Sequence, residues 1–262
     1  MFGFFSQSFN AGMRPAIGQQ VTRSNLLSLF PSTQLWYDFS GTGSSSYSPV
    51  PTNVANGGSM TQAHDISGAN HNTNTVSNFK YITNAFGSLG AADLSTGNGG
   101  YFNTNSTTSW LGNLSGMTVI VVAYQKSAGN TYYLCNTDQG DLGIYYTGSK
   151  WTVKCSGGTG VSNIGSTNNT WQMHSFVYDG NGSTNAQKLR YRYNKADQAL
   201  TITGTIAAKS NASNDNYVWA AQDTSSTNAF KGYIGEVLLF NIALSSGQIT
   251  AIESYLGGKW GI

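Results

Sequence analysis

Residues 231–262 read KGYIGEVLLFNIALSSGQITAIESYLGGKWGI, and this stretch decides the fold. It contains an apolar run at 234–240 that predicts a strand. A helix follows whose first turn carries a capping box, because the Ser245 side chain can accept the Gln248 backbone N–H while the Gln248 side chain reaches back. The stretch therefore predicts a closing strand that leads into a C-terminal helix.

The predicted helix is apolar on one side. Ile249, Ile252 and Leu256 lie at positions i, i+3 and i+7, so they form a stripe that has to be buried. Gly257 and Gly258 come next, and two consecutive glycines predict that the helix ends there.

The composition of the chain is that of an all-β protein. Only 9% of its 262 residues are charged, whereas 39% are hydrophobic and 13% aromatic, and 32 glycines accompany just 4 prolines. Short strands joined by Ser, Thr, Asn and Gly turns produce this balance. The net charge of +2 is too small, and the basic residues too scattered, to predict a nucleic-acid partner. No apolar run approaches the roughly 20 residues that cross a bilayer, and the first residues lack the pattern of a signal peptide.

Alternating side chains predict a series of short strands. The clearest is LRYRY at 189–193, in which a leucine and two tyrosines oppose two arginines. The other strands are expected at 35–37, 117–124, 131–135, 142–146, 151–155, 172–178, 200–206 and 217–220. Many short strands, turn-rich connections and one terminal helix predict a two-sheet antiparallel sandwich.

Residues 1–30 differ from the rest, with four phenylalanines at irregular spacing: Phe2, Phe4, Phe5 and Phe9. An apolar terminus is ordered only where something holds it, so we expect an extended N-terminal arm that is pinned on its own domain or on a neighbouring subunit. The sandwich domain then occupies 31–262. It includes a loop-rich insertion at about 41–98, which is dominated by Gly, Ser, Asn and Thr.

Three motifs carry a family resemblance: NTWQMHSFVYDG at 169–180, KLRYRYN at 188–194 and FKGYIGEVLLFNIALSSGQITAIESYLGGKW at 230–260. Together they resemble the laminin-G-like, concanavalin A-like lectin/glucanase domain family, and the resemblance covers about 35–262. It implies that the sandwich is a jelly roll. It does not select a ligand, because this fold carries binding modules, hydrolases and purely structural domains.

The glucanases of this family make glycoside hydrolysis the sharpest enzymatic hypothesis. A retaining glycosidase needs two carboxyls about 5 Å apart, and the family glucanases present them as ExDxE or ExDxxE. This chain has two glutamates, Glu236 and Glu253, and neither has an Asp two or three residues away. The sequence also has no GxSxG elbow, and His174 lies within a strand pattern. We therefore expect that the protein is not an enzyme.

Calcium is the one cofactor that the sequence leaves open. The resemblance implies Ca²⁺ in a rim loop, where carboxylate, amide and carbonyl oxygens supply the ligands. Asn136, Asp138 and Asp141 in CNTDQGDLG form the best local cluster. The alternative for the same residues is a solvated Asx turn.

The two cysteines, Cys135 and Cys155, are too few for a disulfide scaffold. They either pair across a hairpin or remain buried free thiols. The three histidines lie far apart in the chain, so the spacing of a zinc site is missing.

Carbohydrate binding is the broader hypothesis, because sugars stack their C–H faces on aromatic rings and hydrogen-bond to amides and carboxylates. Tyr145, Tyr146 and Trp151 follow the Asp138/Asp141 loop on a predicted hairpin, and Tyr101 and Trp110 flank another loop. The alternative is that these aromatics, at alternating strand positions, belong to the core.

The low charge, the polar turns and the apolar arm are similar to those of bacteriophage virion proteins that carry laminin-G-like or lectin-like domains. We therefore expect a structural protein of the virion surface, such as a decoration, head fibre or tail appendage. Its partners would be other virion proteins or copies of itself, bound through the arm, and host polysaccharide on the exposed sandwich. The alternative is a secreted or cell-surface carbohydrate-binding module, and a glycoside hydrolase comes third.

Overall fold

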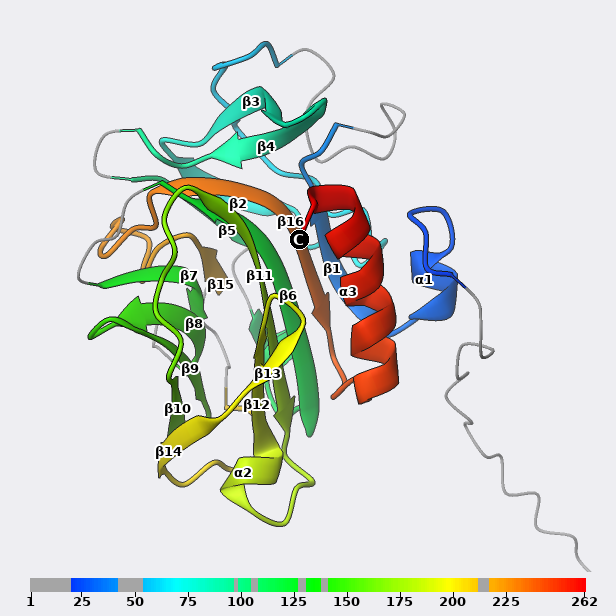
Figure 1. Ribbon diagram of the computed structural model, residues 1–262, viewed down its shortest axis with the longest axis vertical. Coiled ribbons are helices and arrows are strands. Elements are labelled where there is room, and N and C mark those ends of the chain that lie inside the picture. The colour runs from blue at the N-terminus through cyan, green and yellow to red at the C-terminus, as the bar shows by residue number, and fades with distance from the viewer. Residues whose placement is uncertain are drawn as a thin grey trace, which may run out of the picture.

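Two antiparallel sheets lie face to face in the computed structural model, which describes residues 20–41, 54–96, 99–104, 108–126, 131–137, 141–211 and 217–262 (Figure 1). One helix of four turns lies along the outer face of one sheet. This architecture confirms the predicted all-β sandwich with a short C-terminal helix.

The sheet that carries the helix, sheet A, has the strand order β13-β12-β11-β6-β16-β4-β3, and β1 also pairs with β16. Its strands are β1 (Thr33–Asp38), β3 (Lys80–Phe86), β4 (Leu89–Asp93), β6 (Gly116–Gln125), β11 (Thr170–Asp179), β12 (Leu189–Tyr193), β13 (Ala196–Gln198) and β16 (Gly232–Phe240).

Sheet B has the order β14-β10-β9-β8-β7-β15-β5-β2. Its strands are β2 (Thr73–Ser77), β5 (Tyr101–Thr104), β7 (Thr131–Thr137), β8 (Leu142–Thr147), β9 (Lys150–Cys155), β10 (Gly158–Ser162), β14 (Leu200–Gly204) and β15 (Tyr217–Trp219). The helical segments are α1 (Leu26–Leu29), the 3₁₀ turn η2 (Thr108–Leu111), α2 (Asn185–Lys188) and α3 (Ser246–Trp260). None of the described helices is long and apolar enough to span a bilayer.

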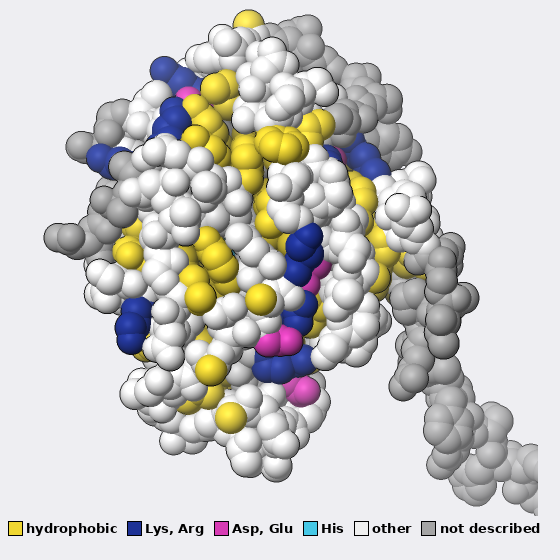
Figure 2. All heavy atoms as spheres, in the orientation of Figure 1, with side chains coloured by type: hydrophobic (Ala, Val, Ile, Leu, Met, Phe, Trp, Pro, Cys, Tyr) yellow, Lys and Arg dark blue, Asp and Glu magenta, His cyan; other side chains and the backbone are white. Residues whose placement is uncertain are grey.

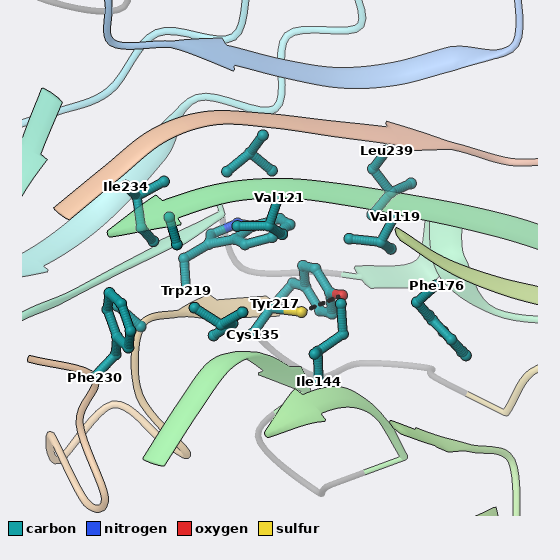
Figure 3. Close-up of a cluster of buried hydrophobic side chains, with 14 of the residues drawn as sticks. Val119, Val121, Cys135, Ile144, Phe176, Tyr217, Trp219, Phe230, Ile234 and Leu239 are labelled. Atoms are coloured by element: carbon teal, nitrogen blue, oxygen red, sulfur yellow. Dashed lines mark hydrogen bonds between the residues drawn. The ribbon is translucent and has the colours of Figure 1, made fainter. Parts of the chain in front are cut away.

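The core lies between the sheets and follows the side-chain alternation of the strands. In β6, Val119 and Val121 point inward, whereas Ile120 and Val122 belong to a second cluster under α3. Figure 3 shows the inward residues of both sheets meeting, with the Tyr217 hydroxyl donating to the Cys135 sulfur at 3.3 Å. Strand β6 is therefore buried on both faces, between the sheets on one side and under α3 on the other.

Both cysteines are buried free thiols, so the question of a disulfide between them is settled. Burial raises the pKa of each thiol, Cys135 and Cys155, to about 12. At neutral pH both remain protonated, which makes them poor nucleophiles.

Helix α3 begins as predicted, with both hydrogen bonds of the Ser245/Gln248 capping box present, and its apolar stripe is buried. Its end differs from the prediction, because the helix continues through Gly257 and Gly258 to Trp260 and is capped by Gly261 in the left-handed conformation (φ 67°). Two helical glycines cost about 1 kcal/mol each relative to alanine. Hydrogen bonds from the side chains of the last helical turn to sheet A offset this cost.

Part of the predicted arm packs on the sandwich. Val21, Leu26 and Phe30 are buried beside α3, and the rings of Phe30 and Phe240 meet edge to face at 6.1 Å. The four arm phenylalanines, Phe2, Phe4, Phe5 and Phe9, lie outside the described residues. The loop-rich insertion at about 41–98 holds β2, β3 and β4 in its described part.

Candidate functional site

The inner face of sheet B holds two of the five predicted sugar-binding aromatics. Trp151 is 1% exposed and Tyr146 is 8% exposed, and both rings contact Tyr132 at centroid distances of 5.5 and 5.0 Å. The His174 ring, which comes from sheet A, also contacts Trp151, with ring centroids 4.2 Å apart. Because protein atoms cover these rings, a saccharide cannot stack on Trp151 or Tyr146 in this structure.

Tyr145 lies on the opposite, outer face of the same strand. Its cross-strand partner is Tyr133 of β7, and the two rings are stacked with centroids 4.7 Å apart at 20°. Both side chains are partly exposed. Burial raises the pKa of both phenols, and the neighbouring Tyr145 and Asp223 raise that of Tyr133 further. Both hydroxyls therefore stay protonated at neutral pH and can donate hydrogen bonds.

Polar side chains of sheet B surround this tyrosine pair. Thr131 and Thr147 pair directly with each other across β7 and β8, two residues along from the tyrosines, and their hydroxyls are 3.1 Å apart. On the next strand, Thr152 pairs with Tyr145, and its hydroxyl has no hydrogen-bond partner among the described residues. Thr152 is 1% exposed, so we call the four partly exposed residues, Thr131, Tyr133, Tyr145 and Thr147, the tyrosine face.

The other two predicted aromatics lie elsewhere. Tyr101 of β5 is buried in a small cluster with Val218 and Ala221. Trp110 of η2 stacks on His71, with ring centroids 3.9 Å apart at 16°. The five aromatics thus occupy four different surroundings and do not form one site.

The predicted calcium ligands are only partly described, because Asp138 lies outside the described residues. The Asn136 side-chain N–H donates to the Gln222 carbonyl at 2.8 Å, and the backbone N–H of Asp141 donates to the Thr137 hydroxyl at 2.8 Å. Within the described ranges, no three His, Cys, Asp or Glu residues come close enough together to hold a metal ion. Calcium at this loop stays a prediction.

The structure gives Glu236 a carboxylate neighbour that the sequence does not reveal. Asp38 of β1 is its direct cross-strand partner, and Lys259 of α3 donates to both carboxylates, at 2.8 Å to Asp38 and 2.7 Å to Glu236. Arg23 adds a second ion pair to Asp38, at 3.2 Å. Two cations and two carboxylates therefore meet under the C-terminal end of α3.

Glu236 is fully engaged in this cluster. Its Oε1 accepts the Trp36 indole N–H at 2.8 Å, and its Oε2 accepts the Trp260 indole N–H at 3.1 Å besides the Lys259 ammonium. Burial raises the pKa of this carboxyl, the charge of Asp38 raises it further, and Lys259 offsets part of the increase. With both oxygens occupied and the side chain buried, Glu236 holds α3 on sheet A and presents no atom to a substrate.

Glu253, in the middle of α3, has a similar position. It is 1% exposed, accepts the Ser175 hydroxyl at 2.7 Å, and receives three hydrogen bonds from the Arg192 guanidinium. Arg192 is one of the two outward arginines of the LRYRY strand. These contacts give both glutamates a structural role, since each holds α3 on sheet A.

Sequence reasoning missed Tyr133 and Asp38. A bulge in β7 between Tyr133 and Cys135 sets the register that joins Tyr133 to Tyr145, and no alternation pattern reveals a bulge. Asp38 and Glu236 meet through a pairing between the first and last strands, which cannot be read from local spacing. The one available signal was the YY dipeptide, which occurs in both strands of this hairpin and must place one ring on each face.

No protein-family model matches this sequence, and no curated protein matches it. Solved structures do resemble the fold. Domain 4 of AbnA, an extracellular arabinanase from Geobacillus stearothermophilus, in complex with arabinotriose, matches 84% of this chain and 98% of its own, with a TM-score of 0.55 and 12% identity. The ligand-binding domain of botulinum neurotoxin serotype D in complex with N-acetylneuraminic acid matches 85% of this chain and 50% of its own, with a TM-score of 0.54 and 13% identity.

The Trypanosoma rangeli sialidase in complex with sialic acid matches 87% of this chain, with a TM-score of 0.56 and 10% identity. This chain spans about half the length of the toxin domains and a third of the sialidase. At such low identity these likenesses show the β-sandwich fold alone.

Proposed function

We propose that this protein is a carbohydrate-binding module and that the tyrosine face of sheet B binds the saccharide. The observation that carries the proposal is the stacked pair of Tyr133 and Tyr145, partly exposed beside the hydroxyls of Thr131 and Thr147. The two helices that cover a sheet face, α1 and α3, lie on the other sheet (Figure 1).

The chemistry of the tyrosine face suits a neutral sugar. Aromatic rings contact the C–H surface of a pyranose or furanose ring, while phenol and threonine hydroxyls exchange hydrogen bonds with its hydroxyl groups. The Thr152 hydroxyl beside Tyr145 is buried, so it does not contact the sugar. Two of the structural neighbours were solved with arabinotriose and N-acetylneuraminic acid, which supports a saccharide as the ligand class.

A glycan array, read with and without Ca²⁺, tests this proposal. We expect binding to at least one polysaccharide, and about a tenfold loss of affinity, or roughly 1.4 kcal/mol, in Tyr133→Ala and in Tyr145→Ala. Tyr145→Phe is the matched control, because it keeps the ring and should retain most of the binding. Failure to bind any glycan would remove the lectin role, and full affinity in both alanine variants would move the site elsewhere.

We also propose that the module sits on a virion surface, attached by its N-terminal arm. The support is that Val21, Leu26 and Phe30 fix the base of the arm on sheet A, and that Arg23 pairs with Asp38. Deleting residues 1–19 tests the proposal while leaving this base intact. Unchanged oligomeric state and unchanged incorporation into particles would reject it, and a secreted or cell-surface module would then be preferred.

Hydrolysis is not part of the proposal. Two carboxylate pairs share a cation among the described residues: Asp38 and Glu236 share Lys259, and Asp197 and Glu253 share Arg192. Asp38, Glu236 and Glu253 are buried, so neither pair presents two carboxylates to a substrate. Glycan hydrolysis that is abolished by Glu236→Gln, in a variant shown to be folded, would overturn this view.

A further inference from the structure

A second aromatic surface lies on sheet A, beyond the C-terminal end of α3. Tyr233, Tyr124 and Trp171 are direct cross-strand partners on β16, β6 and β11, so their side chains stand in one line across three strands. The ring centroids of Tyr233 and Tyr124 are 5.4 Å apart, and those of Tyr124 and Trp171 are 5.6 Å apart. All three side chains are partly exposed, because α3 covers the strands only as far as Trp260.

Phe86, at the end of β3, extends this line. It is 36% exposed and meets Trp171 edge to face at 6.4 Å. We call Tyr124, Trp171, Tyr233 and Phe86 the aromatic row. Figure 2 shows hydrophobic side chains gathered on this part of the surface, between the β3–β4 hairpin and the end of α3, with basic side chains beside them.

The aromatic row ends in a chain of polar groups. The Lys126 ammonium lies 4.2 Å from the centroid of the Tyr233 ring and donates to the Ser95 hydroxyl at 3.0 Å. Ser95 in turn donates to the Asp93 carboxylate at 2.5 Å, and Asp93 is the cross-strand partner of Tyr233. A cation, a hydroxyl and a carboxylate are thus held in fixed positions beside the rings.

We propose that the aromatic row is a second saccharide-binding surface, so that one chain of this protein binds two polysaccharide strands. This inference rests on the proposed function, since it extends the same ligand class to the opposite sheet. Aromatic rings with a few oriented hydrogen-bonding groups are the lining expected of a small-ligand site. The rings would contact the sugar, and the Lys126–Ser95–Asp93 chain would hydrogen-bond to its hydroxyls.

The size of the surface favours a saccharide over a protein partner. Aromatic side chains bury about 150–250 Å² each, so four rings exposed by no more than about a third offer roughly 250 Å². A stable protein interface needs about 800 Å² on each partner. The charges of Lys126 and Asp93 balance each other, which favours a neutral sugar over an acidic one.

The placement of the two surfaces decides what bivalent binding would do. The tyrosine face and the aromatic row lie on the outer faces of opposite sheets, so they point away from each other. One flat surface cannot engage both, and the gain in affinity that linked sites give on a single surface is therefore excluded. Two separate polysaccharide strands can be bridged instead.

Affinity electrophoresis and light scattering together test this proposal. The full chain would be run in native gels that contain arabinan, xylan, laminarin or a sialylated mucin, and then mixed in solution with the polysaccharide that retards it. Wild type is compared first with two double variants, Phe86→Ala/Tyr233→Ala and Tyr133→Ala/Tyr145→Ala. Circular dichroism establishes that each is folded, and Phe86→Ser alone serves as a milder second variant of the row.

We expect wild type to be retarded and to cross-link the polysaccharide, with a rise in scattering. Each double variant should still be retarded, by about half as much, and should raise no scattering. Retardation and scattering of Phe86→Ala/Tyr233→Ala equal to those of wild type would overturn the second site and leave the tyrosine face standing. Complete loss in that variant, with Tyr133→Ala/Tyr145→Ala unaffected, would refute the tyrosine face and bivalence together.

Two further outcomes are decisive. Absence of retardation by every polysaccharide would reject both surfaces. Concentration-dependent dimerisation of wild type in sedimentation, lost in Phe86→Ala/Tyr233→Ala, would assign the aromatic row to a second copy of the chain and overturn the saccharide proposal.

Discussion

The outer faces of the two sheets differ in what becomes of their polar and charged groups. On sheet A, α3 covers the strands, and Glu236, Glu253 and Asp38 are buried with cationic partners beneath it. On sheet B, the stacked Tyr133 and Tyr145 stay partly exposed beside threonine hydroxyls. The buried carboxylates hold α3 on the sheet, whereas the exposed aromatics remain accessible to a ligand. Exposure therefore separates the structural residues from the candidate binding residues.

Trp151 and Tyr145 test this contrast with the largest expected change in stability. Both were predicted sugar-binding residues, but only Trp151 is buried. Trp151→Ala should lower the free energy of unfolding by about 4 kcal/mol, since it removes a fully buried indole from between the sheets. Tyr145→Ala should cost about 1 kcal/mol, the value of a cross-strand aromatic pair. Urea unfolding measures both. Equal losses would mean that the two faces of sheet B are not distinguished by burial.

Lys259→Met breaks the cluster under α3. It leaves Asp38 and Glu236 side by side with Arg23 as the one remaining cation of the cluster, and we expect a loss of about 3 kcal/mol at pH 7. The folded-state pKa of Glu236 is already above its usual value, and losing Lys259 raises it further. The folded state then binds a proton that the unfolded state has released, so the loss should shrink as the pH falls from 7 to 5.

Lys259→Arg is the control for this variant, because it keeps the charge. Unfolding free energies at the two pH values decide the matter. If Lys259→Met lowers the free energy of unfolding by less than about 1 kcal/mol, or by more as the pH falls, the cluster does not hold α3 on sheet A.

How much of this could be read from the sequence follows from the range of each interaction. The Ser245/Gln248 box and the LRYRY alternation are local, and both predicted their elements. The end of α3 could not be predicted, because contacts with Glu236 and Asp38 carry the helix past two glycines. Tyr145 can be singled out from the sequence as an aromatic beside a loop, and its role stays a prediction. Its partner Tyr133 depends on a bulge and a register that only the assembled sheet defines.

The buried His174 should make the stability of the protein depend on pH. Burial lowers its pKa to about 3, so the unfolded state takes up a proton near pH 6.5 while the folded state does not. Wild type should therefore lose about 2 kcal/mol of stability through this group between pH 7 and 5. His174→Phe should show a smaller decrease, and His64→Gln, at an exposed position, should behave as wild type. An identical pH dependence in His174→Phe would contradict the burial of a neutral imidazole.

The two cysteines should react very little with an alkylating reagent in the folded protein. Cys135 and Cys155 are buried, and their raised pKa keeps them as thiols, so iodoacetamide at pH 8 should modify neither in the folded protein. Mass spectrometry after unfolding in urea should find both alkylated. Modification of either thiol at the rate of a small peptide would show that sheet B opens readily.

The most direct test of the account is the binding of one array-positive polysaccharide to wild type, Tyr133→Ala/Tyr145→Ala and Lys259→Met, measured by affinity electrophoresis where all three are folded. The account predicts weaker binding in the tyrosine variant and wild-type binding in Lys259→Met, despite its lower stability. Weak binding in Lys259→Met together with full binding in the tyrosine variant would contradict it. Polysaccharide binding would then depend on the charged residues under α3 and not on the exposed tyrosines of sheet B.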